Sequence, residues 1–202
     1  MKIAREGRTR LLLAGTMLAL VALSSCVPVF SIHPLYTDKD VVFDPHLLGT
    51  WFEPPSSDDH SVVMFERLNT DAYTISITDP TKQPSPVETY QAHLVQLNNR
   101  LFIDAVQSDI KVGGDNALVL AVAGHMFGRI SLGEDGLRMS FLDDEWIEKA
   151  LRDGMISIPH ETTDDGTPVL TATTLELERF VLAHADDAKA FSIAVGPLER
   201  RK

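Results

Sequence analysis

Apolar and polar residues alternate in short runs through the middle of the chain. The clearest run is Ala72–Thr78, in which Tyr73, Ile75 and Ile77 share one face and threonine and serine occupy the other. A period of two is typical of a strand with one buried face. Comparable segments predict strands at 48–53, 61–68, 87–97, 101–107, 117–132 (one strand or two) and 137–142. Because turn residues separate these segments, the pattern indicates an antiparallel meander.

The apolar positions change period in the last third of the chain. Asp143 or Asp144 can cap a helix that ends before Gly154, with Trp146, Ile147, Ala150 and Leu151 on its apolar side. A second helix is predicted from Thr174, with an apolar side formed by Leu175, Leu177, Phe180, Val181 and Leu182. A short helical turn at 186–191 follows. We therefore expect one domain over 46–202, mainly β with two or three short flanking helices.

The first 25 residues have the pattern of a secretory signal. Four basic residues precede an apolar run at 11–23, which is shorter than the roughly 20 residues of a membrane-spanning helix. Residues 23–26, Leu-Ser-Ser-Cys, resemble a bacterial lipobox, which implies cleavage before Cys26 and acylation of its thiol. An ordinary signal peptide with a chance cysteine and an uncleaved anchor are the alternatives. Residues 26–45, with three prolines, are expected to form a lipidated tether.

Removal of residues 1–25 changes the charge balance of the chain. It leaves 14 Lys and Arg against 28 Asp and Glu, a formal charge of −14. Such a charge argues against nucleic acid and against an anionic membrane surface as the main partner. Attachment to the membrane is expected through the acyl chains on Cys26 instead. Since Val27 is not the aspartate that retains many lipoproteins in the inner membrane, the periplasmic side of the outer membrane is the expected location in the cell envelope.

Gly49-Thr50-Trp51, at the start of the first predicted strand, resembles the Gly-x-Trp of lipocalins and related calycin barrels. The resemblance implies that the meander closes into a barrel, with Trp51 packed across its closed base. The arginine that the family carries near its closing strand is not identified in this sequence.

A longer resemblance covers nearly all of the chain after the signal. Residues 34–37 (Pro-Leu-Tyr-Thr), 41–45 (Val-Val-Phe-Asp-Pro) and 47–51 (Leu-Leu-Gly-Thr-Trp) are similar to the opening of a group of uncharacterised bacterial lipoproteins. His125, the helix start at 142–146 and Leu-Thr-Ala at 170–172 belong to the same resemblance. The resemblance implies attachment to the membrane and a β-rich architecture, but it implies no reaction.

Residues that could carry catalysis or hold a metal are scattered. The seven histidines lie in separate predicted elements, the only cysteine belongs to the lipobox, and the paired aspartates lie in turns or helix starts. We therefore expect no metal, no cofactor and no catalytic residue. His125, Phe127 and Arg129 share one face of their strand; they would line a pocket if that face points into a barrel. If it points outward, they meet solvent and helices, which is the orientation that we favour.

The leading functional hypothesis is a membrane-anchored, lipocalin-like module that binds a small apolar or amphipathic molecule. The candidate lining residues are Trp51, Phe65, Tyr73, Ile75, Ile103, His125, Phe127 and Arg129. For Trp51, a role as a plug of the core is favoured over ligand contact. The alternative is a filled β-domain that serves as a structural or interaction protein of the envelope. An enzyme is the third hypothesis.

Overall fold

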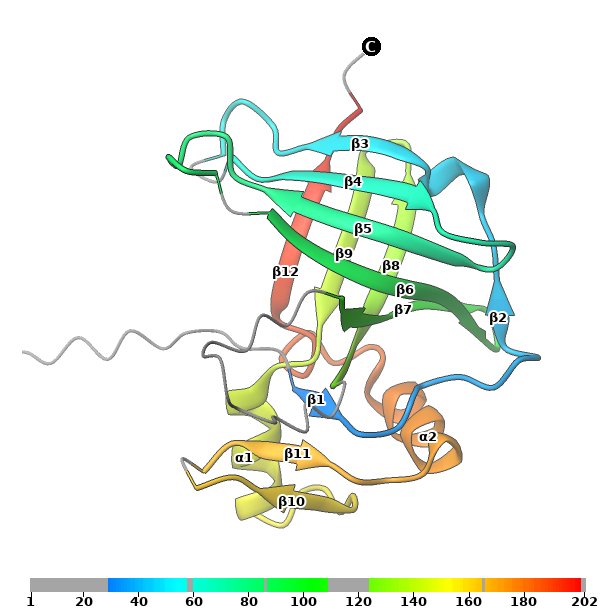
Figure 1. Cartoon of the computed structure of the whole chain (residues 1–202). Coiled ribbons are helices and arrows are strands. Elements are labelled where there is room, and N and C mark those ends of the chain that lie inside the picture. Colours follow the sequence, from blue (N-terminus) through cyan, green and yellow to red (C-terminus); the bar gives the residue numbers. More distant parts are fainter. Residues whose placement is uncertain (1–28, 58–59, 86, 109–123, 165, 201–202) are drawn as a thin grey trace, which may run out of the picture.

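The computed structural model describes residues 29–57, 60–85, 87–108, 124–164 and 166–200, which form a mainly β domain with two α-helices (Figure 1). The predicted signal, Cys26 and the 117–123 part of a predicted strand lie outside these residues. The meander consists of β3 (Gly49–Phe52), β4 (Val62–Arg67), β5 (Ala72–Thr78), β6 (Val87–Leu97), β7 (Arg100–Gln107), β8 (His125–Gly133) and β9 (Gly136–Phe141). Each strand pairs antiparallel with the next, as predicted.

The meander wraps over itself without closing into a barrel. In Figure 1, β3–β6 lie across β8, β9 and β12 (Ile193–Leu198), the last of which pairs antiparallel with β9. In the described part of the chain, strand pairing between the two ends of this wrap is limited to an isolated bridge, where Phe52 and Glu199 exchange backbone hydrogen bonds of 2.9 and 2.8 Å. A continuous ladder between β3 and β12 is not formed.

The part of the expected tether that the structure describes belongs to the fold. β1 (Phe30–Ser31) pairs with both β8 and β11 (Pro168–Leu170), and β2 (Val41–Val42) pairs with β6. Leu35 is completely buried. The expectation of a tether up to residue 45 is therefore wrong for 29–45, because apolar side chains in this proline-containing stretch pack into the core without any regular period.

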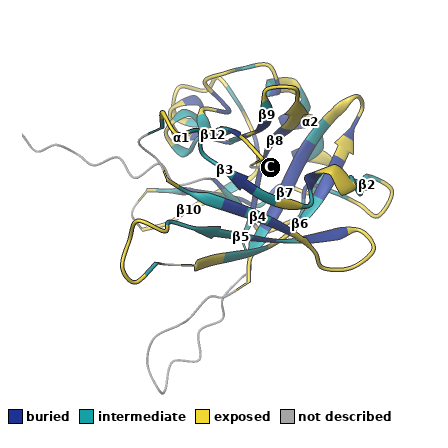
Figure 2. Ribbon diagram, turned by 90° about the horizontal axis from the view of Figure 1, so that it is seen from above, coloured by how far each residue is buried: buried dark blue, intermediate teal, exposed yellow. Residues whose placement is uncertain are grey.

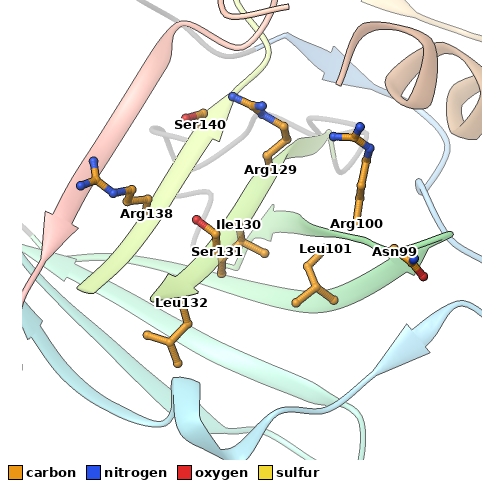
Figure 3. Close-up of a pocket in the computed structure, with 9 residues that line it drawn as sticks. All are labelled: Asn99, Arg100, Leu101, Arg129, Ile130, Ser131, Leu132, Arg138 and Ser140. Carbon is orange, nitrogen blue, oxygen red and sulfur yellow. The ribbon is translucent and has the colours of Figure 1, made fainter. Parts of the chain in front are cut away.

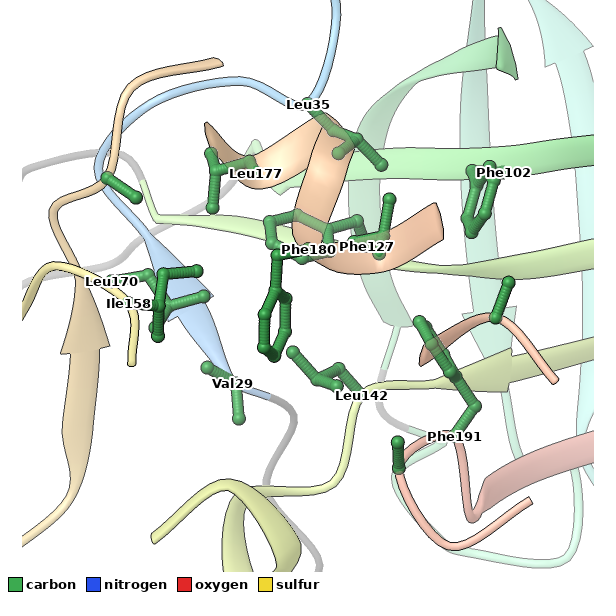
Figure 4. Packing of buried hydrophobic residues seen from close by; sticks show 14 of the residues in the cluster. Val29, Leu35, Phe102, Phe127, Leu142, Ile158, Leu170, Leu177, Phe180 and Phe191 are labelled. Atoms are coloured by element: carbon green, nitrogen blue, oxygen red, sulfur yellow. The ribbon is translucent and has the colours of Figure 1, made fainter. Parts of the chain in front are cut away.

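The buried side chains form two cores on opposite faces of the sheet. The inner core lies inside the wrap and joins β3–β5 to β9 and β12, with Trp51, Phe65, Tyr73 and Met139 among its members. The outer core lies between β6–β8 and a layer of α1 (Asp144–Arg152), α2 (Thr174–His184), β10 (His160–Thr162) and β11 (Figure 4). Figure 2 shows the exposed residues gathered at the turns and outer surfaces around these cores.

The apolar residues of β6 do not stay on one face of the strand. Its pairing with β5 and β7 is continuous. Ala92 and Leu94 face the inner core, whereas Val95 and Leu97 face the outer core. The apolar positions change face along β6 because this strand is sandwiched between two cores.

The helices dock as amphipathic elements, with one local correction. Ile147 and Ala150 of α1 are buried, and the Trp146 ring contacts the rings of Phe180 and His184 at centroid distances of 6.4 and 5.2 Å. Trp146 therefore joins α1 to α2. Leu175, expected on the apolar side of α2, is 54% exposed. Among the described residues, no helix has the length and apolar character needed to cross a membrane.

Candidate functional site

The structure divides the candidate ligand-binding residues between the two faces of the sheet. Trp51, Phe65, Tyr73, Ile75 and Ile103 belong to the inner core. His125, Phe127 and Arg129 lie on the outer face of β8, which meets the helical layer. The eight residues therefore do not form one pocket, and the outward orientation that the sequence favoured for His125, Phe127 and Arg129 is the one observed.

An apolar cavity of about 180 Å³ lies at one end of the inner core, where β5–β9 and β12 come together. Its lining consists of Ile75, Ile77, Tyr90, Ile103, Ala105, Met126, Met139, Phe141, Ile193 and Val195. Of the candidates named from the sequence, only Ile75 and Ile103 are in this set. Ile77, Met139 and Phe141 could have been added, because alternation places them on the same strand faces as predicted inward residues. Ile193 and Val195 carried no such signal.

The volume of the cavity limits what it can hold. Pockets for drug-sized ligands measure about 300–1,000 Å³. An apolar cavity of about 150 Å³ stays dry and binds a molecule as small as benzene. The cavity of about 180 Å³ therefore suits a small apolar molecule or the apolar end of a longer one.

Tyr90 supplies the phenol group of the lining. Its hydroxyl donates a hydrogen bond of 2.8 Å to Glu88 Oε2. Burial and this negative neighbour raise the pKa of Tyr90 above its ordinary value. The phenol is therefore neutral at physiological pH, and the cavity lining carries no formal charge.

The other aromatic candidates brace the inner core rather than line the cavity. The Tyr73 ring stacks on Phe43 with centroids 4.6 Å apart, and its hydroxyl accepts from the Asp44 N–H at 2.7 Å. Phe65 contacts the same ring edge-on at 6.0 Å. These contacts fix residues 43–44 against β5.

Trp51 is a plug of the inner core, as predicted, and an arginine covers it. Trp51 Nε1 donates to the Leu47 carbonyl at 2.9 Å, and the Arg200 guanidinium lies over the indole, 4.5 Å from the ring centroid. Arg200 also donates to the carbonyls of His46 and Leu48. Arg200 follows β12 in the chain and meets Trp51 only in the folded structure.

The outer-face residues make structural contacts. Asp104, only 1% exposed, accepts from the Leu35 N–H at 2.7 Å and pairs with His125 Nδ1, also at 2.7 Å. Arg129 donates to the Ala185 carbonyl at 2.6 Å and lies 5.4 Å from the Phe191 ring centroid. Among the described residues, no three His, Cys, Asp or Glu side chains lie close enough to hold one metal ion.

No protein-family model matches the chain, and neither the curated proteins nor the solved structures compared with it give a match.

Proposed function

We propose that the domain binds a small apolar molecule, or the apolar end of an amphipathic one, in the cavity at the end of the inner core. The observation that carries the proposal is the lining itself. It consists of aliphatic, methionine and aromatic side chains, and its one phenol hydroxyl is bound to Glu88. An apolar group that fills an apolar cavity of this size gains dispersion contacts with the lining.

We also propose that the wrap acts as a lipocalin-like module in which contacts between side chains and single backbone groups hold its two ends together. Two contacts support this part of the proposal. The Phe52–Glu199 bridge joins the end of β3 to the residue that follows β12, and Arg200 covers Trp51 close to this bridge. Gly49 has a φ of +124°, a backbone conformation that favours glycine. The backbone therefore explains the glycine of Gly-Thr-Trp at the start of β3.

The proposed setting is the bacterial envelope, with the chain held to the periplasmic side of the outer membrane by acyl chains on Cys26. This part rests on the lipobox-like sequence at residues 23–26. Two or three acyl chains hold a protein stably on a bilayer.

Native mass spectrometry on residues 27–202 tests the binding function. This chain retains every residue that the structure describes and is purified without detergent. We expect extra mass that an organic solvent removes, or uptake of benzene or a hydrophobic dye by the bare protein. A measured mass equal to that of the protein alone, with no uptake of benzene or dye, would contradict the proposal. It would favour the alternative hypothesis of a ligand-free interaction protein of the envelope.

Two alanine-to-leucine substitutions test whether uptake occurs in the cavity. Ala105→Leu fills the cavity from its wall and is expected to abolish uptake without loss of folding. Ala194→Leu adds the same atoms at an exposed position of β12 and should leave uptake unchanged. Equal uptake by both variants would place the ligand elsewhere.

A further inference from the structure

β7 and β8 separate from each other near the β6–β7 turn. Their pairing ends at Phe102 and Arg129, although β7 begins at Arg100 and β8 continues to Gly133. Among the described residues, no strand pairing bridges the two edges beyond that point. A hollow of about 450 Å³ occupies this gap in the wall.

The two sides of the gap differ in chemistry. Figure 3 shows the guanidinium groups of Arg100 and Arg129 on one side of the strands and the side chains of Leu101 and Leu132 on the other. Leu132 lies in this gap with 39% of its surface exposed. The gap is therefore cationic outside and apolar inside.

The cationic side gathers three arginines in a strongly acidic chain. Arg138 and the hydroxyls of Ser131 and Ser140 also line it. Since Ser131 is opposite Arg138 and Ser140 is opposite Arg129 on the paired strands β8 and β9, these polar groups share one face. Their N–H and O–H groups are hydrogen-bond donors of the kind that bind carboxylate and phosphate oxygens.

The existing partners of these arginines leave room for an anion. Arg100 pairs with Asp186 at 2.7 Å and Arg138 pairs with Asp135, but all four side chains are 42% or more exposed. Exposed pairs are weak and exchange readily. Arg129 has no carboxylate hydrogen-bond partner in the described part of the chain, and its buried Nε has no hydrogen-bond partner there at all. Two aspartates against three arginines leave one positive charge in excess.

The apolar side leads toward the cavity of the inner core. Ile130 lines the gap, and Met139, directly opposite it on β9, lines the cavity. Both side chains belong to the inner core. The linings of the two hollows therefore meet at this cross-strand pair.

We infer that the gap between β7 and β8 binds the head of an amphipathic anion, a carboxylate or phosphate on an alkyl chain, with the chain directed past Leu101 and Leu132 toward the cavity. The placement of the chain rests on the proposed function. The placement of the head rests on Arg100, Arg129, Arg138 and the two serines. The cavity alone is too small for a long chain, whereas the gap and the cavity together provide about 450 and 180 Å³.

Binding of four probes to residues 27–202, measured by calorimetry, tests the inference. The probes are hexadecanoate, hexadecyl phosphate, hexadecanol and inorganic phosphate. We expect both alkyl anions to bind at least about tenfold more tightly than hexadecanol and inorganic phosphate. The stronger of the two anions identifies the head as carboxylate or phosphate. Inorganic phosphate that binds as tightly as hexadecyl phosphate would overturn the amphipathic occupant.

Two added carboxylates serve as a matched pair of variants. Ser131→Glu places a negative charge at the exposed mouth of the gap and is expected to remove the preference for anions. Thr162→Glu adds the same charge at an exposed position of β10 and should leave the preference for anions unchanged. Arg138→Gln should weaken the alkyl anions about threefold to tenfold, and Arg152→Gln on α1 should not.

The two proposals fail in different ways. Benzene uptake that Ala105→Leu abolishes, together with equal binding of hexadecanol and hexadecanoate, would leave the cavity function intact and overturn the anion site. Retention of the anion preference in Ser131→Glu would overturn it as well. Anion binding without any uptake of benzene would contradict the cavity function but leave the head site in place.

Discussion

Asp104, which is buried, pairs with the half-buried His125 on the outer face of the sheet, with Asp104 Oδ1 2.7 Å from His125 Nδ1. The second carboxylate oxygen accepts from the Leu35 N–H, so one side chain joins β7, β8 and the segment that follows β1. Nearby, the Tyr36 ring lies 4.5 Å from the ring of His93, which is opposite Asp104 on β6. The hydrogen bonds of Asp104 to His125 and to the Leu35 N–H agree with a structural role for the pair.

Replacement of Asp104 by alanine is expected to lower the free energy of unfolding by about 2–3 kcal/mol, because the Leu35 N–H and His125 Nδ1 both lose a buried acceptor. Urea unfolding followed by circular dichroism measures the change. Glu134→Gln, in an exposed turn, is the control and should change stability little. An Asp104→Ala variant as stable as the parent would show that the carboxylate does not hold the N-terminal segment in place.

Removal of Arg200 is expected to destabilise the end of the wrap. Arg200→Ala loses the cation–π contact with Trp51 and the hydrogen bonds to the carbonyls of His46 and Leu48, at a cost of about 1 kcal/mol. Trp51 fluorescence should also shift toward longer wavelength as water reaches the ring. Arg179→Ala on the exposed surface of α2 is the matched control. If both variants behave alike, Arg200 does not stabilise this end of the wrap.

The three tyrosines are expected to resist ionisation while the chain is folded. Burial raises the pKa of each phenol, and the negative charges of Asp104 and Glu88 raise it further for Tyr36 and Tyr90. For Tyr73, burial outweighs the hydrogen bond from the Asp44 backbone, which lowers the pKa. Above about pH 10, the ordinary tyrosine pKa, the unfolded chain releases these protons and the folded chain retains them. Folding stability therefore falls as pH rises through this range.

Alkaline titration by ultraviolet absorbance measures the tyrosine effect. The native protein should show less tyrosinate at pH 10 than the same chain in urea, and should gain it together with loss of structure. Identical titration curves in the two conditions would contradict the burial of the three phenols.

A methyl group at Gly128 is expected to disturb the wall of the cavity. A Cβ there would lie 2.7 Å from the Ser140 carbonyl oxygen and 3.0 Å from Phe141 Cα and Cδ1, so the backbone of β9 must move. Gly128→Ala should cost about 1–3 kcal/mol in urea unfolding and should alter ligand uptake, since Phe141 lines the cavity. Gly133→Ala is the control, because its Cβ would meet only the flexible Asp135 side chain.

Sequence periodicity was informative wherever a strand or helix buries one face. The run from Tyr73 to Ile77 and the run from Leu137 to Phe141 both direct the predicted face to the inner core. β12 was not predicted, because Gly196 and Pro197 interrupt its apolar pattern and its partner β9 lies more than fifty residues earlier. β1 is too short for any period to appear.

The site was harder to predict than the fold. Alternation groups His125 with Phe127 and Arg129, but it cannot say which face of a sheet becomes the inside when both faces are covered. The two cores resolve that choice only in three dimensions. The contact of Arg200 with Trp51 and the separation of β7 from β8 likewise depend on how distant segments meet, and neither leaves a local pattern.

The burial of Val29 in the outer core sets the reach of the proposed anchor (Figure 4). Only Val27 and Pro28 lie between Cys26 and Val29, so these three residue steps span at most about 11 Å of extended chain. The chain between an acylated Cys26 and the domain would therefore be too short for the domain to rotate freely above the bilayer. The side of the molecule formed by β1 and its neighbours would face the lipid, and the direction from which a ligand or partner can approach would follow from that fixed orientation.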